Sequence, residues 1–299
     1  MKKIFLMILS LIFLPTSLFA KVNVVATLPT FAALAEEVGK GLVDVKSLAR
    51  GDQDPHFLEP KPSYAVLLNK ADLVLEDGLE LEVGWLPVLL TQSRNPKIQV
   101  GQKGHLNLSE GIPVLEVPSG KVDRSEGDVH PLGNPHYWLD PRNALIMSRN
   151  IANRLKELDP AHSTQYEENF LAFQSRLQSK IQSWDQKLKS YRAKKMVTYH
   201  RSLSYFSNWS GIEVAAYVEP KPGISPSPNH LLSLISLIQT QKIPVIVSEN
   251  YYDMKPSQQL SEKSKTKLVL VSSSVGGSPT IKTYEDLIED LVQKITGAL

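Results

Sequence analysis

Short runs of aliphatic and β-branched residues alternate along most of the chain with stretches in which apolar residues recur every three or four positions. In the first half, strand-like runs at 22–27, 43–49 and 72–75 alternate with helical patterns at 31–38, 62–70 and 81–90. The alternation returns later, with strands at 195–199, 212–218, 244–248 and 268–272 and helices at 204–209, 230–240, 256–265 and 284–295. Such alternation is typical of βαβ units with parallel sheets. The pattern therefore predicts an α/β fold with two βα lobes.

A different pattern separates the two halves. From 141 to 192 the apolar residues keep helical spacing, with one interruption at Asp159-Pro160, because proline disfavours a helical residue before it. The second piece, 161–191, contains no Gly or Pro and corresponds to a helix about 45 Å long. We expect a connecting helix between an N-terminal lobe (21–140) and a C-terminal lobe (195–299), with 141–194 as the connecting helices. The alternative is a two-helix hairpin packed on one domain.

The first twenty residues have the pattern of a secretory signal peptide. Met1-Lys2-Lys3 is followed by an apolar run from Ile4 to Leu14 and by the small residue Ala20. The run is shorter than the roughly 20 residues that span a bilayer, and a buried N-terminal helix is the alternative. Cysteine is absent, which predicts no disulfide, no thiolate metal site and no lipid-anchor Cys. We expect a free periplasmic protein.

The charge balance argues against one class of partner. The formal net charge is +2, and the basic residues are scattered along the chain. No basic stretch of the kind that binds nucleic acid is present. We expect a monomer that does not bind nucleic acid.

Three of the seven histidines occupy distinctive places. His56 follows the second predicted strand, His200 ends the strand at 195–199, and His136 stands at the entrance to the connecting helices. In open α/β sheets, ligands bind beyond the carboxyl ends of the strands. A single loop imidazole is nevertheless more often a surface residue than a metal ligand. The sequence contains no HxxxH pair that would favour a metal site.

The segments around these histidines resemble a known family. They are Gly51-Asp52-Gln53-Asp54-Pro55-His56, Asp77-Gly78-Leu79-Glu80-Leu81-Glu82, Pro135-His136-Tyr137-Trp138-Leu139-Asp140-Pro141 and Val197-Thr198-Tyr199-His200. In this order they resemble the zinc- and manganese-binding proteins of ABC importers, over 21–299. The resemblance implies two α/β lobes bridged by one long helix, a metal in the interlobe cleft, and an ABC permease with its ATPase as partners. It implies His56, His136 and His200 as ligands, and no enzymatic activity.

The donor set bears on the metal. Three neutral imidazoles suit Zn²⁺, whereas carboxylate-rich sites suit Mn²⁺. In this family the third ligand position is Glu in manganese proteins, so His200 favours zinc, with Mn²⁺ as the alternative.

The chain departs from the family at the fourth ligand, which is usually an Asp just before a Tyr in the last loop. Lys282 and Thr283 precede Tyr284 here, and a protonated lysine does not bind a metal. We expect Glu249, at the end of the strand 244–248, to be a direct or water-bridged ligand. We take it to be the only acidic residue at a strand's carboxyl end in the lobe of His200. Hydrogen bonding to a ligand histidine, or capping a loop, is an equally supported role for Glu249.

The remaining histidines are interpreted as structural or solvated. Zinc members of the family often have a His-rich loop before the second ligand; here the stretch from Leu115 to Leu132 contains only His130, with Asp123, Glu126 and Asp128. We expect a plain solvated loop, with a weak metal-collecting loop as the alternative. His105, His162 and His230 lie in loop or surface-helix contexts.

Two other functions remain open from the residues alone. A secreted zinc-dependent hydrolase also uses three histidines and a nearby Glu, but HExxH, GxSxG and a Gly-rich nucleotide loop are absent. A metal-dependent adhesin or metallochaperone would use the same site.

Overall fold

The computed structural model describes residues 21–120, 127 and 129–299, so the predicted signal peptide, residues 1–20, lies outside the described residues. The first half contains β1 (Val22–Ala26), α1 (Pro29–Gly39), β2 (Val43–Ser47), α2 (Pro62–Asn69), β3 (Leu73–Glu76), α3 (Leu86–Ser93) and β4 (His105–Asn107). The second half contains β5 (Lys195–Thr198), α6 (Ser204–Ser210), β6 (Glu213–Tyr217), α7 (Pro228–Gln241), β7 (Val245–Glu249), α8 (Met254–Ser264), β8 (Lys267–Val271) and α9 (Tyr284–Thr296).

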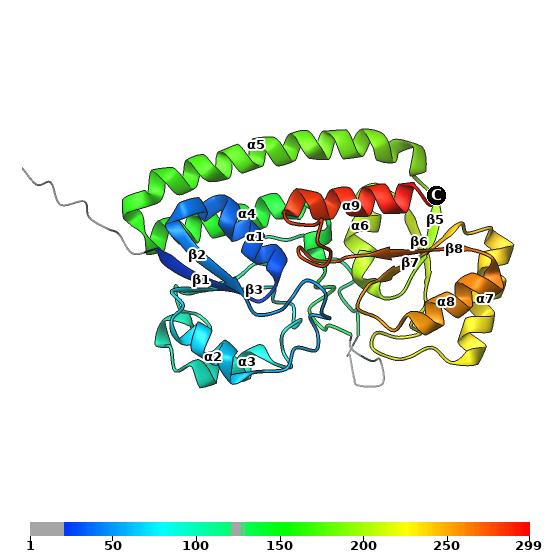
Figure 1. Cartoon of the computed structure of the whole chain (residues 1–299), viewed down its shortest axis with the longest axis horizontal. Helices are drawn as coiled ribbons and strands as arrows, with labels where there is room; N and C mark the ends of the chain where they lie inside the picture. Colours follow the sequence, from blue (N-terminus) through cyan, green and yellow to red (C-terminus); the bar gives the residue numbers. More distant parts are fainter. Residues whose placement is uncertain (1–20, 121–126, 128) are drawn as a thin grey trace, which may run out of the picture.

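Each half forms its own parallel sheet. The strand orders are β2-β1-β3-β4 and β6-β5-β7-β8. All five residues of β7 are buried, which is typical of a strand covered on both faces. Proline stands in the first turn of α1, α2, α3 and α7, where its missing N–H removes no helical hydrogen bond. The predicted α/β fold with two lobes and parallel sheets is confirmed (Figure 1).

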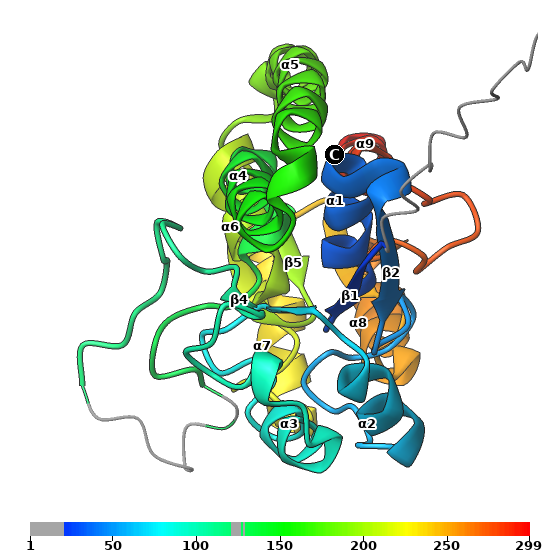
Figure 2. The ribbon, with the colours of Figure 1, turned by 90° about the vertical axis from the view of Figure 1, so that its left-hand side faces the viewer.

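Two helices join the halves. α4 (Pro141–Leu158) leads into α5 (Ser163–Leu188), which has 26 residues and so extends about 39 Å. Near its start, Asn169 donates to the carbonyl of Val38 in α1. Near its end, Asp185 accepts from the indole of Trp209 in α6. Figure 1 shows α5 running along one side of both lobes, and Figure 2 shows it above α4 and α1. The connecting helix is therefore present; the boundaries at 140/141 and 194/195 stay predictions.

The two lobes also touch directly. Trp138 is fully buried and donates to the carbonyl of Ser273, which follows β8. Tyr284, at the start of α9, donates in turn to the carbonyl of Trp138. Thr30 and Ser274 share a buried hydroxyl contact of 2.9 Å. Hydrogen bonds therefore link the start of α1 and Trp138 to the loop after β8 and to the start of α9.

Two details differ from the sequence-based expectations. The helix predicted for 81–90 begins only at Leu86, because Gly78, Leu79 and Glu80 all have positive φ angles of 83°, 52° and 68° and form a turn. The carboxylate of Glu82 accepts from the backbone N–H groups of Asp77 and Gly78 and so holds this turn. The three-residue strand β4 was not predicted. In the described part of the chain, no helix is both long and apolar enough to cross a membrane.

Candidate metal centre

His56, His136 and His200 come together between the two lobes. They are the one group of at least three His, Cys, Asp or Glu side chains, among the described residues, whose potential ligand atoms all lie within 4.8 Å of one another. The side chain of His56 is 7% exposed, and His136 and His200 are 1% and 4% exposed as whole residues. Three segments that are far apart in sequence therefore converge on one nearly buried point.

The same local device orients the first two rings. In Asp54-Pro55-His56, Asp54 Oδ1 accepts from the backbone N–H of His56 at 3.0 Å and contacts its ring Nδ1 at 2.7 Å. In Asn134-Pro135-His136, Asn134 Oδ1 makes the same two contacts with His136, both at 2.9 Å. A turn of this kind is typical of Asp and Asn, whose side chains bond the backbone two residues on. The sequence contains this repeated pattern, but its orienting role was not predicted.

The third ring is oriented by a residue from a neighbouring strand. His200 lies just beyond β5, and its Nδ1 contacts Glu219 Oε2 at 2.8 Å. Glu219 lies just beyond β6, the strand paired with β5, and is 8% exposed. Our expectation that Glu249 is the only acidic residue at a strand's carboxyl end in this lobe is therefore wrong. Glu219 follows closely after the end of β6 in the sequence, and this position could have identified it.

These contacts decide which ring nitrogens are free to bind a cation. A carboxylate or amide oxygen facing Nδ1 is an acceptor, so the proton stays on Nδ1 and the lone pair is on Nε2. The Nε2 atoms of His56 and His136 are buried and have no hydrogen-bond partner. A histidine whose second nitrogen donates to an oxygen is the usual form of a metal ligand. The three side chains thus have the chemistry of a nitrogen-donor cation site.

The spacing of the rings also suits zinc. A Zn–N bond of about 2.0–2.1 Å places a ring centre about 3.2 Å from the ion, so tetrahedral geometry sets ring centres about 5.2 Å apart. The ring centres of the three pairs are separated by 5.2 Å (His56 and His136), 5.4 Å (His56 and His200) and 5.2 Å (His136 and His200). The separations of the three ring centres match those expected around one tetrahedral ion.

Burial favours the neutral form of His136, and acidic side chains beside His56 and His200 supply negative charge. Burial, and then the charges of the neighbouring histidines, holds the pKa of His136 well below its ordinary value. Burial acts to raise the pKa of Asp54, but the hydrogen bonds and charge of His56 outweigh it and lower that pKa. Trp138 lies 5.3 Å from the ring of His136, and Tyr252 lies 6.1 Å from that of His200. These aromatic rings limit the access of water on two sides.

Glu249 is placed near this centre but stands outside the group of three. It ends β7 and is 1% exposed; Oε1 accepts from Ser202, while Oε2 is buried without a partner. Burial is the main cause that raises its pKa to about 7. Its role as a direct or water-bridged ligand stays a prediction. Lys282 is exposed, and its backbone N–H donates to Asp286.

His130 differs from its predicted solvated environment. It is partly buried, its Nε2 has no contact with solvent or a partner, and its ring centre lies 5.3 Å from that of His56. Burial is the main cause that lowers its pKa to about 3. The interpretation of this histidine as part of a plain solvated loop is therefore wrong. Asp123, Glu126 and Asp128 lie outside the described residues.

The other histidines have structural contacts of their own. His105 is buried, and its Nε2 contacts Glu76 at 2.5 Å. His162 contacts Asp159 at 2.7 Å, and His230 contacts the carbonyl of Tyr217 at 3.1 Å. These contacts fit structural roles for the three, but His105 lies buried in strand β4 rather than in a loop or a surface helix.

A chain with two α/β lobes, a bridging helix and a nearly buried group of three histidines between the lobes has the form of a solute-binding protein. The chain belongs to the ZnuA family, the periplasmic component A of the zinc-uptake complex, whose family model matches residues 24–298. It is similar to the metal ABC transporter substrate-binding lipoprotein ScbA of Streptococcus cristatus, with 27% identity over 81% of this chain and 76% of the relative. A crystal structure of ZnuA aligns with a TM-score of 0.79 and 26% identity, covering 93% of this chain and 99% of the other. A zinc-bound deletion mutant of ZnuA aligns with a TM-score of 0.78 and 25% identity, over 93% and 98% of the two chains.

Proposed function

We propose that this protein is the substrate-binding component of a metal ABC importer, which binds one Zn²⁺ between its lobes and delivers it to a membrane permease. The observation that carries the proposal is the convergence of His56, His136 and His200, each with Nδ1 held by an oxygen. In this proposal the three Nε2 atoms are the ligands. Membership of the ZnuA family supports the same cargo.

The donor set supports zinc over manganese. A relative from Streptococcus gordonii is named a manganese transporter protein, so the family includes both metals. Mn²⁺ is best matched by carboxylate and carbonyl oxygens, whereas imidazole nitrogens suit Zn²⁺. The group of three in this chain contains imidazoles alone. We therefore propose Zn²⁺ as the cargo and Mn²⁺ as a weaker ligand.

Charge compensation comes from residues behind the ligands. Three neutral imidazoles leave the +2 charge of the ion intact, and a buried charge is costly unless an opposite charge is near. Asp54 and Glu219 each contact the Nδ1 of a ligand histidine at 2.7 and 2.8 Å. Two carboxylates, each separated from the ion by one imidazole ring, therefore balance its +2 charge in this proposal. Glu249, with an unpartnered Oε2, is proposed to add a contact through a bridging water.

The chain lacks the sequence motifs of the hydrolase alternative. HExxH and GxSxG are absent. Membership of the ZnuA family supports a binding role instead. We therefore propose a binding protein without enzymatic activity, working as a monomer in the periplasm with an ABC permease and its ATPase as partners.

The test is the metal content and affinity of purified protein. The parent is expected to retain one Zn²⁺ per chain through gel filtration, and His56→Ala, His136→Ala and His200→Ala are each expected to weaken zinc binding by orders of magnitude. His230→Ala, a histidine in another part of the same lobe as His200, serves as the control and should bind like the parent. A triple alanine variant that keeps stoichiometric zinc would refute the site. Ester or peptide hydrolysis that depends on the bound zinc would favour the enzyme instead.

A further inference from the structure

The side-chain amide of Asn134, which orients His136, is itself held from its other end. Its Oδ1 faces the backbone N–H and the Nδ1 of His136, both at 2.9 Å. Its Nδ2 donates to Glu116 Oε2 at 3.0 Å and to the backbone carbonyl of Arg201 at 2.9 Å. An amide group has one accepting end and one donating end. Because both partners of Nδ2 are acceptors, they keep the nitrogen away from His136 and the oxygen toward it.

Glu116 makes hydrogen bonds with both of its carboxylate oxygens. Oε2 accepts from Asn134, and Oε1 accepts at 2.8 Å from the hydroxyl of Ser204, the first residue of α6. Glu116 stands outside the group of three histidines, so its link to the centre runs through Asn134. Its backbone has a φ angle of 54°, a left-handed conformation that costs free energy in a residue with a side chain. The fold therefore keeps Glu116 in an unfavourable conformation in which its carboxylate joins two other segments.

The charge of Glu116 is offset by a neighbouring cation. The guanidinium of Arg201 lies 3.9 Å from Glu116 Oε2, and both side chains are partly exposed. An ion pair that is open to solvent contributes little by itself. Glu116 therefore matters for the hydrogen bonds that it accepts more than for any charge that it adds to the ligands.

The same contacts connect two of the proposed ligands to each other. Arg201, whose carbonyl accepts from Asn134, directly follows His200 in the chain. Tyr205, in α6, donates to the backbone carbonyl of Asn134 at 2.9 Å. The segment that carries His136 is therefore hydrogen-bonded to the segment that begins at His200.

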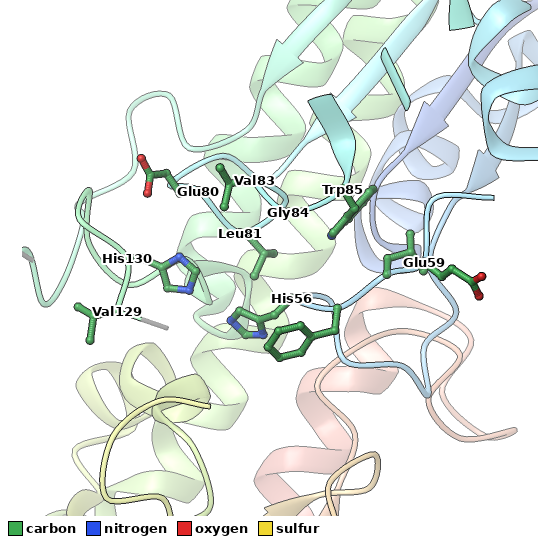
Figure 3. A pocket seen from close by; sticks show the side chains of 11 residues that line it. His56, Glu59, Glu80, Leu81, Val83, Gly84, Trp85, Val129 and His130 are labelled. Carbon is green, nitrogen blue, oxygen red and sulfur yellow. The ribbon is translucent and has the colours of Figure 1, made fainter. Parts of the chain in front are cut away.

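His56 is supported within its own lobe. Asp54, in the same loop, orients its ring, and the indole of Trp85 donates to the carbonyl of Pro55 at 3.0 Å. Figure 3 shows His56 and Trp85 beside a hollow of about 550 Å³ that both residues line. The centre thus consists of two histidines whose segments are bonded to each other and a third that a separate loop carries.

We propose that Glu116 is a positioning residue of the metal centre, which holds the amide of Asn134 so that His136 and His200 are set on each other before the ion binds. The inference rests on the proposed function, since it concerns the same three ligands. Through Asn134, Glu116 favours the form of His136 that carries its proton on Nδ1, so the lone pair of Nε2 is available to the ion. A ligand that is already oriented loses less conformational freedom on binding, which raises the affinity.

Zinc affinities of matched variants of the mature chain test this role in competition with a chelator. Glu116→Ala removes both hydrogen bonds and should weaken zinc binding by about tenfold, the low end of the range for outer partners of ligand histidines. Glu116→Gln keeps an oxygen for Asn134 and should bind within about threefold of the parent. Glu110→Ala removes a carboxylate at an exposed position and should bind like the parent. Equal losses for Glu116→Gln and Glu116→Ala would overturn the proposal.

A double-mutant cycle separates positioning from a general structural role. If Glu116 acts through Asn134, Glu116→Ala should have almost no further effect on zinc affinity once Asn134→Ala is present. A residue that supports the fold by another route would give additive losses, and additive losses would overturn the proposal. Circular dichroism checks the folding of each variant. If Glu116→Ala does not fold, Ser204→Ala takes its place in the cycle, because it removes the hydrogen bond to Oε1, and the same non-additivity is expected.

Nuclear magnetic resonance of the metal-free protein with isotope-labelled histidine reads out the orientation itself. His136 in the parent should carry its proton on Nδ1, and Glu116→Ala should shift its ring signals toward a mixture of the two tautomers. The signals of His56, which Asp54 orients, should stay unchanged. Unchanged signals of His136 in Glu116→Ala would overturn the proposal. A parent that does not bind zinc, or a His136→Ala variant that binds like the parent, would instead contradict the proposed function, so the two failures are distinguishable.

Discussion

Asp54 and His56 are joined twice, since one oxygen of Asp54 accepts from the backbone N–H of His56 at 3.0 Å and contacts its ring Nδ1 at 2.7 Å. Asn134 and His136 have the same relationship in the other ligand-bearing loop, with both distances at 2.9 Å. The proline between the members of each pair fixes one backbone angle. An Asp/Asn-Pro-His sequence therefore defines both the path of the loop and the direction in which Nε2 points.

We expect the orienting residues to matter almost as much as the ligands. Outer partners of metal-bound histidines are typically worth 10–100-fold in affinity. Asp54→Ala, Asn134→Ala and Glu219→Ala should therefore each weaken Zn²⁺ binding by about 10–100-fold, because the ring loses its fixed tautomer and direction. Competition with a chelator of known affinity measures the effect.

Matched controls separate orientation from general damage. Asp54→Asn keeps an oxygen for Nδ1, as Asn134 does beside His136, and should bind more tightly than Asp54→Ala. The exposed acids Asp52 and Glu213 lie in the same loop as Asp54 and at the start of β6, and their alanine variants should bind like the parent. If Asp52→Ala is as harmful as Asp54→Ala, the effect is one of net charge rather than orientation.

The sequence predicted the grouping of the three histidines better than it predicted the residues that orient them. The alternation of strands and helices is a local property, so both lobes and the long helix followed from it. The three histidines followed from the ends of strands and from a family resemblance. Glu219 was missed because its contact with His200 depends on the pairing of β5 with β6, a relation that no local pattern records. His130 was misjudged for a similar reason, since its burial depends on a turn some fifty residues earlier in the chain.

The affinity for zinc should fall in acid. A protonated imidazole cannot bind a metal, and free histidine has a pKa of about 6.5. Burial holds the pKa of His136 well below its ordinary value, so protons compete less at this ring than at a free imidazole. We therefore expect the affinity to drop below about pH 6, with up to three protons competing. A chelator competition from pH 7.5 to pH 5 measures the slope; a flat profile would indicate carboxylate ligands.

The stability of the metal-free protein should depend on the buried Glu82. Burial, and then the charge of Glu76, raises the pKa of Glu82 from 4.5 to about 7. Between these values the folded state binds more protons than the unfolded state, so the free energy of unfolding falls as the pH rises through this window. The loss is on the order of 3 kcal/mol at most. Glu82→Gln removes this proton uptake and should flatten the profile.

Urea unfolding of the metal-free protein at pH 5 and pH 7.5 measures this difference. The parent should lose stability between the two pH values, and Glu82→Gln should lose clearly less. Glu110→Gln, at an exposed position, should behave like the parent. An identical pH profile for parent and Glu82→Gln would show that the buried carboxyl does not titrate in this range.

The departure at Lys282 leads to the last prediction. Lys282 is exposed and lies just before the capping box in which Thr283 and Asp286 start α9, so its ammonium group is free to remain in solvent. Asp54 and Glu219 already balance the charge of a divalent ion, so a further anion is needed for geometry more than for charge. Glu249 keeps one oxygen on Ser202 and the other without a partner. A water between Glu249 and the ion would satisfy that oxygen and fill a coordination position.

We therefore expect Glu249→Gln to weaken zinc binding by several-fold to about tenfold, because glutamine keeps the shape but loses the charge that orients the water. Lys282→Asp should change the affinity little, since its side chain lies in solvent. Zinc titrations of both variants beside the parent decide the matter: parent-like binding by Glu249→Gln, together with a strong gain for Lys282→Asp, would show that the fourth position is open and that Glu249 has no part in it.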